Sequence, residues 1–301
     1  GFKSFFTSCS LMRSVYRTND DSAFYQKNSP LLAVVTGMER SGTTLLSQLL
    51  NAHPRIKSGV ECGVLLSNIH DFGKVKPFYD WMLASNDKHH WGWSITLSDR
   101  RRLLTAHSYD EFYWLLNLFK GSAHCNPEIQ KKFKQADLIF DKTPRYVYSL
   151  SKIMAKTRYK FLVTLKTPSE QYLSALKYSR TGIVDLVQFK KNYLLAYDQI
   201  NQSFMAYPDR VLIIPYKQLV EEMATVMKQV KSFLALDDKC ILDLEHYNCE
   251  LGSLFSTNIS NKAGNSFTSD RIYYQNPSTV LSSHQLEQLE NAFGGLNLDF
   301  V

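Results

Sequence analysis

The sequence has few cysteines and no long apolar run. Its five cysteines, Cys9, Cys62, Cys125, Cys240 and Cys249, are odd in number and widely spaced, and no two form a CxxC pair. This spacing argues against a structural zinc site and a disulfide framework. It favours a cytoplasmic location over secretion. We expect no bound metal, because no other cluster has metal-ligand spacing either.

Membrane and targeting signals are also scarce. The apolar runs, such as 31–35 and 212–214, fall far short of the roughly 20 residues that a membrane span needs. No signal peptide is visible, so no membrane span is expected in this chain. Residue 1 is Gly rather than Met, so a removed N-terminal anchor stays open.

Clustered positive charge is limited to Arg100, Arg101 and Arg102. A nucleic-acid-binding protein more often carries long basic clusters, so no nucleic-acid partner is expected. The formal charge of +7 suits an anionic ligand without identifying it. With 44% hydrophobic and 21% charged residues, a disordered or fibrous protein is excluded.

Short apolar runs followed by helical patterns predict the fold class. Strands are expected at 31–37, 137–142, 160–166 and 210–216, because such runs are typical of buried parallel strands. Strands that alternate with helices predict an α/β fold with a parallel sheet flanked by helices on both faces.

Helices are expected between and after these strands. Helices are predicted at 43–52 and 146–156, and a further helix is opened by Pro168. Asp185 and Gln188 resemble a capping box for a helix at 186–203, and Ser282 and Gln285 resemble one for the last helix. One apolar stripe over 219–234 predicts the helix that follows the last strand.

The whole chain, 1–301, is expected to form a single domain. Residues 64–136 interrupt the strand–helix alternation and are predicted to be a mostly helical insertion on the acceptor side. Residues 249–281, rich in Ser, Asn and Gly, are predicted to form a long loop that acts as a lid.

The segment 37–44, Gly-Met-Glu-Arg-Ser-Gly-Thr-Thr, follows a predicted strand and opens a predicted helix. In this context backbone N–H groups and the helix N-terminus hold a phosphate, as in a P-loop. Compared with the pattern GxxxxGK[ST], Thr43 stands at the Lys position and the cation has moved to Arg40. This argues against ATP or GTP hydrolysis and suits a 5′-phosphate that is joined to another group.

The segment 39–54, ERSGTTLLSQLLNAHP, resembles the 5′-phosphosulfate loop of sulfotransferases that use 3′-phosphoadenosine-5′-phosphosulfate (PAPS). The carbohydrate and tyrosylprotein branch is most similar. The resemblance implies a P-loop-containing sheet, PAPS as co-substrate and 3′-phosphoadenosine-5′-phosphate (PAP) as product. The loop residues that would bind PAPS are Arg40, Ser41, Gly42, Thr43, Thr44 and Leu45.

Three further segments are similar to this family. In LKTPSEQYLSALKY (165–178), Lys166 and Ser174 take the places of an Arg and a Ser that bind the 3′-phosphate, so Lys replaces the bidentate Arg. VLIIPYKQLV (211–220) places Tyr216 by the nucleotide. DKTPRYVY (141–148) resembles a Lys-Thr-Pro segment and places Lys142 near the transferring sulfonate.

Arg271 is a candidate to close over the 3′-phosphate, with Lys262 as an equal alternative.

A base must take the proton of the acceptor hydroxyl. The resemblance to the tyrosylprotein branch places it at Glu61 in Gly59-Val60-Glu61, where Val60 replaces the first Glu of the family's Gly-Glu-Glu. Histidines are the rival bases. His53 belongs to the helix-end His-Pro motif, where a structural role is favoured, and the others lie in the insertion, namely His70, His89, His90, His107 and His124.

The expected function is PAPS-dependent sulfuryl transfer by in-line displacement to a hydroxyl of a carbohydrate, a tyrosine or a small metabolite. Two alternatives stay open, a kinase-like P-loop enzyme and a catalytically silent PAP-binding module. The acceptor and the oligomeric state are not encoded in any recognisable motif.

Overall fold

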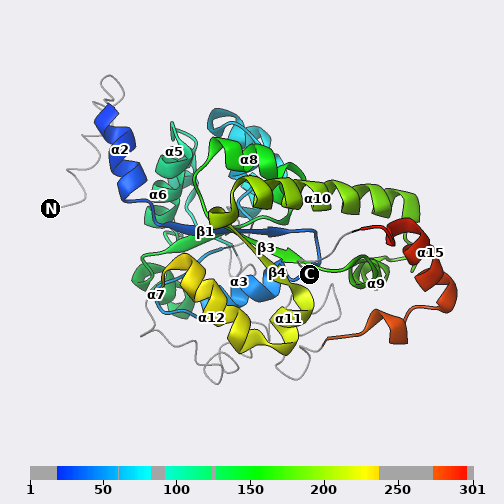
Figure 1. The fold of residues 1–301 in the computed structure, drawn as a ribbon. Coiled ribbons are helices and arrows are strands. Elements are labelled where there is room, and N and C mark those ends of the chain that lie inside the picture. Colours follow the sequence, from blue (N-terminus) through cyan, green and yellow to red (C-terminus); the bar gives the residue numbers. More distant parts are fainter. Residues whose placement is uncertain (1–18, 60, 83–91, 124–126, 237–273, 297–301) are drawn as a thin grey trace.

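In a computed structural model, the described residues are 19–59, 61–82, 92–123, 127–236 and 274–296 (Figure 1). They form a sheet of four parallel strands, β1 (Leu31–Gly37), β2 (Ile139–Lys142), β3 (Phe161–Leu165) and β4 (Val211–Pro215), in the order β2-β1-β3-β4. The predicted α/β fold with a parallel sheet flanked by helices is confirmed. Because the strands are parallel, their carboxyl ends meet at one edge, which is where ligands bind in such sheets.

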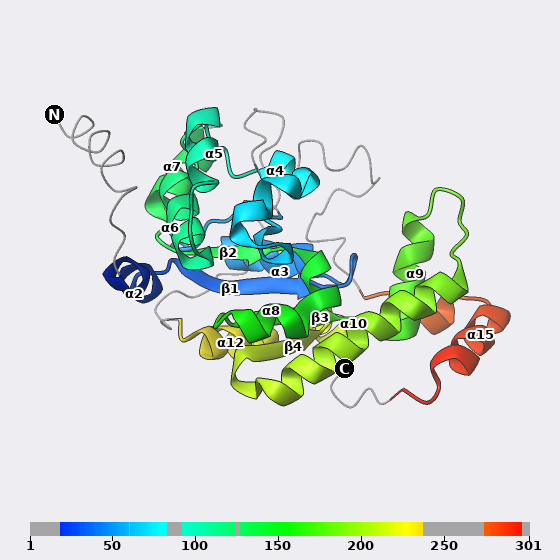
Figure 2. The same ribbon diagram turned by 90° about the horizontal axis from the view of Figure 1, so that it is seen from above.

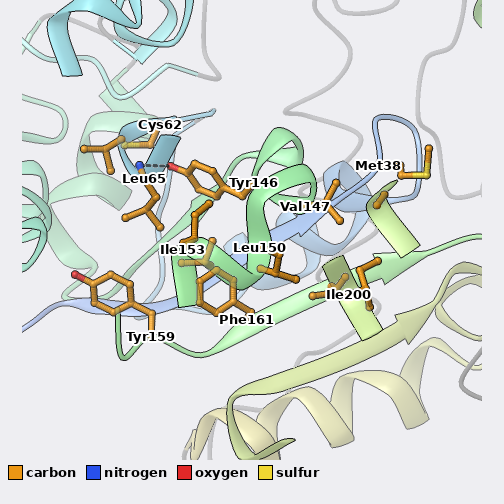
Figure 3. Close-up of a cluster of buried hydrophobic side chains, with 14 of the residues drawn as sticks. Met38, Cys62, Leu65, Tyr146, Val147, Leu150, Ile153, Tyr159, Phe161 and Ile200 are labelled. Atoms are coloured by element: carbon orange, nitrogen blue, oxygen red, sulfur yellow. Dashed lines mark hydrogen bonds between the residues drawn. The ribbon is translucent and has the colours of Figure 1, made fainter. Parts of the chain in front are cut away.

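The strands are buried on both faces, so their sequences read as continuous apolar runs. One face, with Ala33 and Val35 of β1, packs on α3 (Thr43–Asn51) and α12 (Met223–Leu234). The opposite face, with Val34, packs on α8 (Leu150–Lys156) and α10 (Leu186–Ala206). Figure 1 shows α8 and α10 above the strands and α3 and α12 below them, and Figure 2, seen from above, shows α8 and α10 in front of the sheet. Figure 3 shows part of the second core, in which Leu150, Ile153 and Phe161 lie together.

The other helices surround this frame. They are α2 (Asn19–Lys27), α4 (Lys76–Met82), α5 (Leu97–Leu103), α6 (Tyr109–Phe119), α7 (Pro127–Gln135), α9 (Pro168–Tyr178), α11 (Tyr216–Glu221) and α15 (Ser283–Phe293). Short 3₁₀ turns are η1 (Val64–Leu66), η2 (Ile69–Lys74), η3 (Pro144–Ser149), η4 (Pro208–Arg210) and η6 (Pro277–Thr279). No helix among the described residues combines the length and apolarity that crossing a bilayer requires.

The region 64–136 holds η1, η2 and α4 to α7 in its described parts. Its assignment as an acceptor-side insertion stays a prediction. Most of the predicted loop 249–281 lies outside the described residues.

Several helix boundaries differ from the sequence-based ones. The stripe over 219–234 is not one helix, because the backbone at Glu222 leaves helical geometry (φ −126°) and separates α11 from α12. The helix expected from Tyr146 begins as the 3₁₀ turn η3 and becomes α-helical only at Leu150.

The predicted caps are confirmed in part. Ser282 and Gln285 form a complete capping box at α15. Asp185 caps α10 by accepting the N–H groups of Val187 and Gln188, but the Gln188 side chain donates to Asn192 instead of completing the box.

Candidate active site

The loop between β1 and α3 passes tightly against its neighbours. Gly37 has φ 151°, and a Cβ there would lie 2.4 Å from the carbonyl oxygen of Thr164. Gly42 has φ 108°, and a Cβ there would lie 2.7 Å from the Tyr216 ring. Both positions therefore need glycine, because a side chain would be strained in its backbone and would collide with a neighbour.

The N-terminus of α3 is open to an anion. Gly42 is its N-cap, no side chain caps it, and its first turn carries no acidic residue. The unpaired N–H groups of a first helical turn carry partial positive charge, which favours a phosphate. Thr44 is exposed, whereas the side chains of Thr43 and Leu45 are buried. Because the Leu45 side chain is apolar, this residue can offer a phosphate only its backbone N–H group. The residues present therefore fit the 5′-phosphate of a nucleotide.

Ser41 is held within the protein. Its N–H donates to the Met38 carbonyl (3.0 Å), and its fully buried hydroxyl lies 2.7 Å from the hydroxyl of Thr164 on β3. Ser41 therefore ties the loop to the sheet, and a contact with a ligand stays a prediction.

Arg40 lies at the exposed turn of the loop. Its backbone adopts the left-handed conformation (φ 73°), and its guanidinium stacks on the Tyr178 ring, 3.4 Å from the centroid. The preceding residue, Glu39, is fixed by Tyr148, whose hydroxyl donates to its carboxylate (2.9 Å), and by Gln171, whose amide donates to its carbonyl (2.7 Å). These contacts fix Arg40, whose backbone is strained and whose side chain is positively charged, beside the N-terminus of α3. Backbone strain of this kind is typical of functional sites.

Lys166, Ser174 and Tyr216 come together at the ends of β3 and β4. The Lys166 ammonium donates to the Ser174 hydroxyl (2.7 Å) and lies 3.8 Å from the Tyr216 ring centroid. Burial lowers the pKa of Lys166 to about 8, and the nearby charges of Lys177 and Arg40 act in the same direction against that of Glu170. Burial disfavours the charged form of this lysine, and an anion bound beside it would stabilise that form. A perturbed pKa of this kind marks a candidate binding site.

Lys142 and Glu61 form an ion pair at the same edge. The Lys142 ammonium lies 3.5 Å from Glu61 Oε1, at the end of β2 and in register with Val35 of β1. Burial lowers the pKa of Lys142, and Glu61 opposes this shift. Arg40 also lowers this pKa, which places its charge near the pair.

Three of the rival histidines, His53, His70 and His107, have described positions and do not reach this edge. His53 is buried in the turn after α3, where its Nδ1 accepts the N–H of Arg55 (3.2 Å). His70 and His107 line a surface pocket with Arg158 and Tyr159, which precede β3 and so lie at the opposite edge. His89, His90, His124, Lys262 and Arg271 lie outside the described residues.

Four residues at this edge were not singled out from the sequence. They are Thr164, Tyr178, Asp141 and Thr143, of which Tyr178 stands four positions after Ser174 and so shares its helix face. Thr164 and Thr143 could not be found in this way, because their partners Ser41, Cys62 and Gly63 are 80 or more positions away. Asp141 contacts Thr143 and Tyr146 close by in the sequence and Tyr113 28 positions away, and no periodic pattern marks it. Within the described residues, no group of three or more His, Cys, Asp or Glu side chains could hold a metal ion.

Comparison with solved structures finds sulfotransferases. Sulfotransferase STF9 from Mycobacterium avium aligns over 91% of this chain and 78% of its own, with a TM-score of 0.49 and 12% identity. The sulfotransferase domain of the Synechococcus PCC 7002 olefin synthase aligns over 89% of this chain and 88% of its own, with a TM-score of 0.43 and 16% identity.

No curated protein matches the sequence significantly. A family model described as "Sulfotransferase family" matches residues 33–239, which is more than half of the chain. The branch within the family stays a prediction. The match covers the loop 37–44, Lys166 with Ser174, the ion pair of Lys142 and Glu61, the strands β2 to β4 and β1 from Ala33 on, and the chain belongs to the sulfotransferase family of enzymes.

Proposed function

We propose that this enzyme transfers the sulfuryl group of PAPS to a hydroxyl group of an acceptor by in-line displacement. The observation that carries the proposal is the presence of two separate cationic sites at one sheet edge. One is the loop 37–44 with Arg40, and the other is Lys166 with Ser174. Two such sites match a nucleotide that bears phosphate at both its 5′ and 3′ positions.

The loop and Arg40 bind the 5′ end. The amides at the start of α3 hold the 5′-phosphate, with the hydroxyls of Thr43 and Thr44 as further donors. Arg40 lies at the open side of the loop, where it stabilises the charge that grows on the leaving phosphate.

Lys166 and Ser174 bind the 3′-phosphate, and Tyr216 contacts the nucleotide beside them. Lys keeps the charge of the family's Arg but not its bidentate geometry. The stacking on Tyr216 and the bond to Ser174 fix the ammonium instead. Arg271 is proposed as a further contact to this phosphate.

The transfer step needs one base and one cation near the sulfonate. Glu61 accepts the acceptor's proton while the acceptor oxygen bonds to sulfur. The bond from sulfur to the 5′-phosphate oxygen breaks, and its electron pair leaves with PAP. Lys142, 3.5 Å from Glu61, faces the sulfonate oxygens and neutralises part of their charge. The residues 64–136 supply the acceptor side.

A thermal-shift comparison separates this proposal from a kinase-like enzyme. PAP should raise the melting temperature, whereas ATP and adenosine 5′-phosphate at the same concentration should raise it much less, because neither carries a 3′-phosphate. A larger shift with ATP would contradict the proposal.

A second experiment separates an enzyme from a silent PAP-binding module. Radiolabelled PAPS is incubated with a carbohydrate, a tyrosine peptide and a simple phenol, and the label is followed. Transfer to one of these hydroxyls supports the proposal. PAP binding without transfer to any acceptor would favour the silent module.

A further inference from the structure

The segment that follows Glu61 is held by side-chain oxygens. The N–H groups of Cys62 and Gly63 donate to the Thr143 hydroxyl at 3.1 and 3.0 Å. The N–H of Leu65 donates to the Tyr146 hydroxyl at 3.2 Å, the dashed line in Figure 3. Both acceptors belong to the chain that leaves β2 just after Lys142.

A buried carboxylate orients these two hydroxyls. Thr143 donates to Asp141 Oδ1 (2.9 Å) and Tyr146 donates to Asp141 Oδ2 (2.7 Å). A hydroxyl has one proton to give, so donation to Asp141 leaves only its lone pairs for the N–H groups of 62, 63 and 65. Tyr113 also donates to Oδ2 (2.6 Å); its hydroxyl lies near the buried Cys62 thiol, but unlike Thr143 and Tyr146 it accepts no N–H group of the described residues 62–65.

The Asp141 carboxylate therefore accepts a hydrogen bond from each of three hydroxyl groups, those of Tyr113, Thr143 and Tyr146. Asp141 has no exposed surface. Burial raises its pKa, while the hydrogen bonds from Tyr113, Tyr146 and Thr143 and the backbone N–H of Cys62 oppose that shift and favour the ionised form. Its charge also acts on the adjacent Lys142. One carboxylate thus fixes the segment of Glu61 relative to the strand that carries Lys142.

We propose that Thr143 is a positioning residue for Glu61: its hydroxyl, oriented by Asp141, fixes the two amides after Glu61 and so keeps that carboxylate beside Lys142. This inference rests on the proposed function of Glu61 as the base. Thr143 itself is fully buried and touches neither nucleotide site, so its effect should appear in kcat rather than in nucleotide binding.

The test compares Thr143→Val, which keeps the shape and removes the acceptor, with Thr143→Ser, which keeps the hydroxyl. Tyr113→Phe is the matched control, because it removes a hydrogen bond to the same carboxylate and leaves the hydrogen bonds of Thr143 and Tyr146 to the amides of residues 62, 63 and 65 in place. Each is measured in the full chain by turnover of radiolabelled PAPS, by the thermal shift with PAP and by amide exchange of peptides covering 61–66.

Thr143→Val should lower kcat by about tenfold, since small misplacements of a catalytic group cost this much or more. Its PAP response should be unchanged and exchange at 61–66 should be faster. Thr143→Ser and Tyr113→Phe should stay within about twofold of the wild type in kcat. In a Glu61→Gln background, Thr143→Val should add no further loss, because the base it positions is gone.

Three outcomes would overturn the inference: unchanged kcat in Thr143→Val, an equal loss in Tyr113→Phe, or an additive loss in the Glu61→Gln background. Each leaves the proposed function standing if the wild type transfers sulfuryl groups. Absence of transfer by the wild type would instead refute the proposed function, and with it the catalytic part of this inference.

Discussion

Two cations at the candidate site, Arg40 and Lys166, are expected to affect different kinetic constants. In the proposed mechanism, Arg40 lies by the phosphate whose charge grows during transfer, whereas Lys166 meets a phosphate that does not change in the reaction. Interactions made mainly in the transition state raise kcat, and uniform ones lower KM.

Arg40→Ala should therefore lower kcat by roughly a hundredfold or more. Lys166→Ala should mainly raise the KM for PAPS and leave kcat nearly unchanged. Steady-state kinetics of both variants check this, and equal effects on kcat would contradict the division of roles.

The pKa of Lys166, lowered to about 8 by burial, gives nucleotide binding a defined pH dependence. In the proposed site, only the ammonium form of Lys166 pairs with the 3′-phosphate. Below pH 8 the free enzyme already carries that proton, and above pH 8 it must take one up on binding. The Kd for PAP should therefore rise by roughly tenfold between pH 7 and pH 9.

Lys166→Arg is the matched control for this prediction, because guanidinium stays protonated throughout the range. Its Kd, measured by calorimetry, should be nearly flat from pH 7 to pH 9. A rise as steep as that of the wild type would assign the pH dependence to another group, such as Lys142.

At the scale of elements, the loop between β1 and α3 depends on glycine for two reasons. Gly42→Ala introduces backbone strain of about 1 kcal/mol and a collision with the Tyr216 ring, which overpacking data put at about 1–3 kcal/mol. We expect a lower melting temperature and a loss of the PAP-induced shift, because α3 or Tyr216 must move.

Gly182→Ala is the control for strain alone. Gly182 also has positive φ (67°), but a Cβ there meets nothing within 4 Å. It should lower the free energy of unfolding by about 1 kcal/mol and leave the response to PAP intact. A PAP response in Gly42→Ala as strong as in Gly182→Ala would show that the fit against Tyr216 is unimportant.

Local signals allowed most elements to be predicted from the sequence. The four strands are apolar runs, and the caps at Asp185 and Ser282 are short motifs, so each is encoded within a few residues. The break at Glu222 was missed because the apolar stripe continues across it on the same helix face.

The long-range part of the site could not be predicted in this way. The pair of Lys166 and Ser174 lies within one strand–helix unit and was found, by resemblance. The bonds from Thr143 to Cys62 and Gly63 join segments about 80 residues apart. They depend on sheet order, which no local pattern encodes.

At the scale of the whole molecule, the candidate groups meet because four parallel strands end at one edge. β1 leads to Arg40, β2 to Lys142, β3 to Lys166 and β4 to Tyr216. Sequence segments spread over more than half of the chain thus supply one site. The formal charge of +7 also favours the approach of an anionic nucleotide.

The measurement that tests the central claim most directly is sulfuryl transfer from radiolabelled PAPS by the wild type and by Glu61→Gln. Gln keeps the shape of Glu but removes its basicity. The wild type should label a hydroxyl acceptor, and Glu61→Gln should do so roughly a hundredfold more slowly with an unchanged thermal shift in PAP. Equal rates of labelling by the two proteins would contradict the role of Glu61, and absence of labelling by the wild type on every acceptor class would contradict the account as a whole.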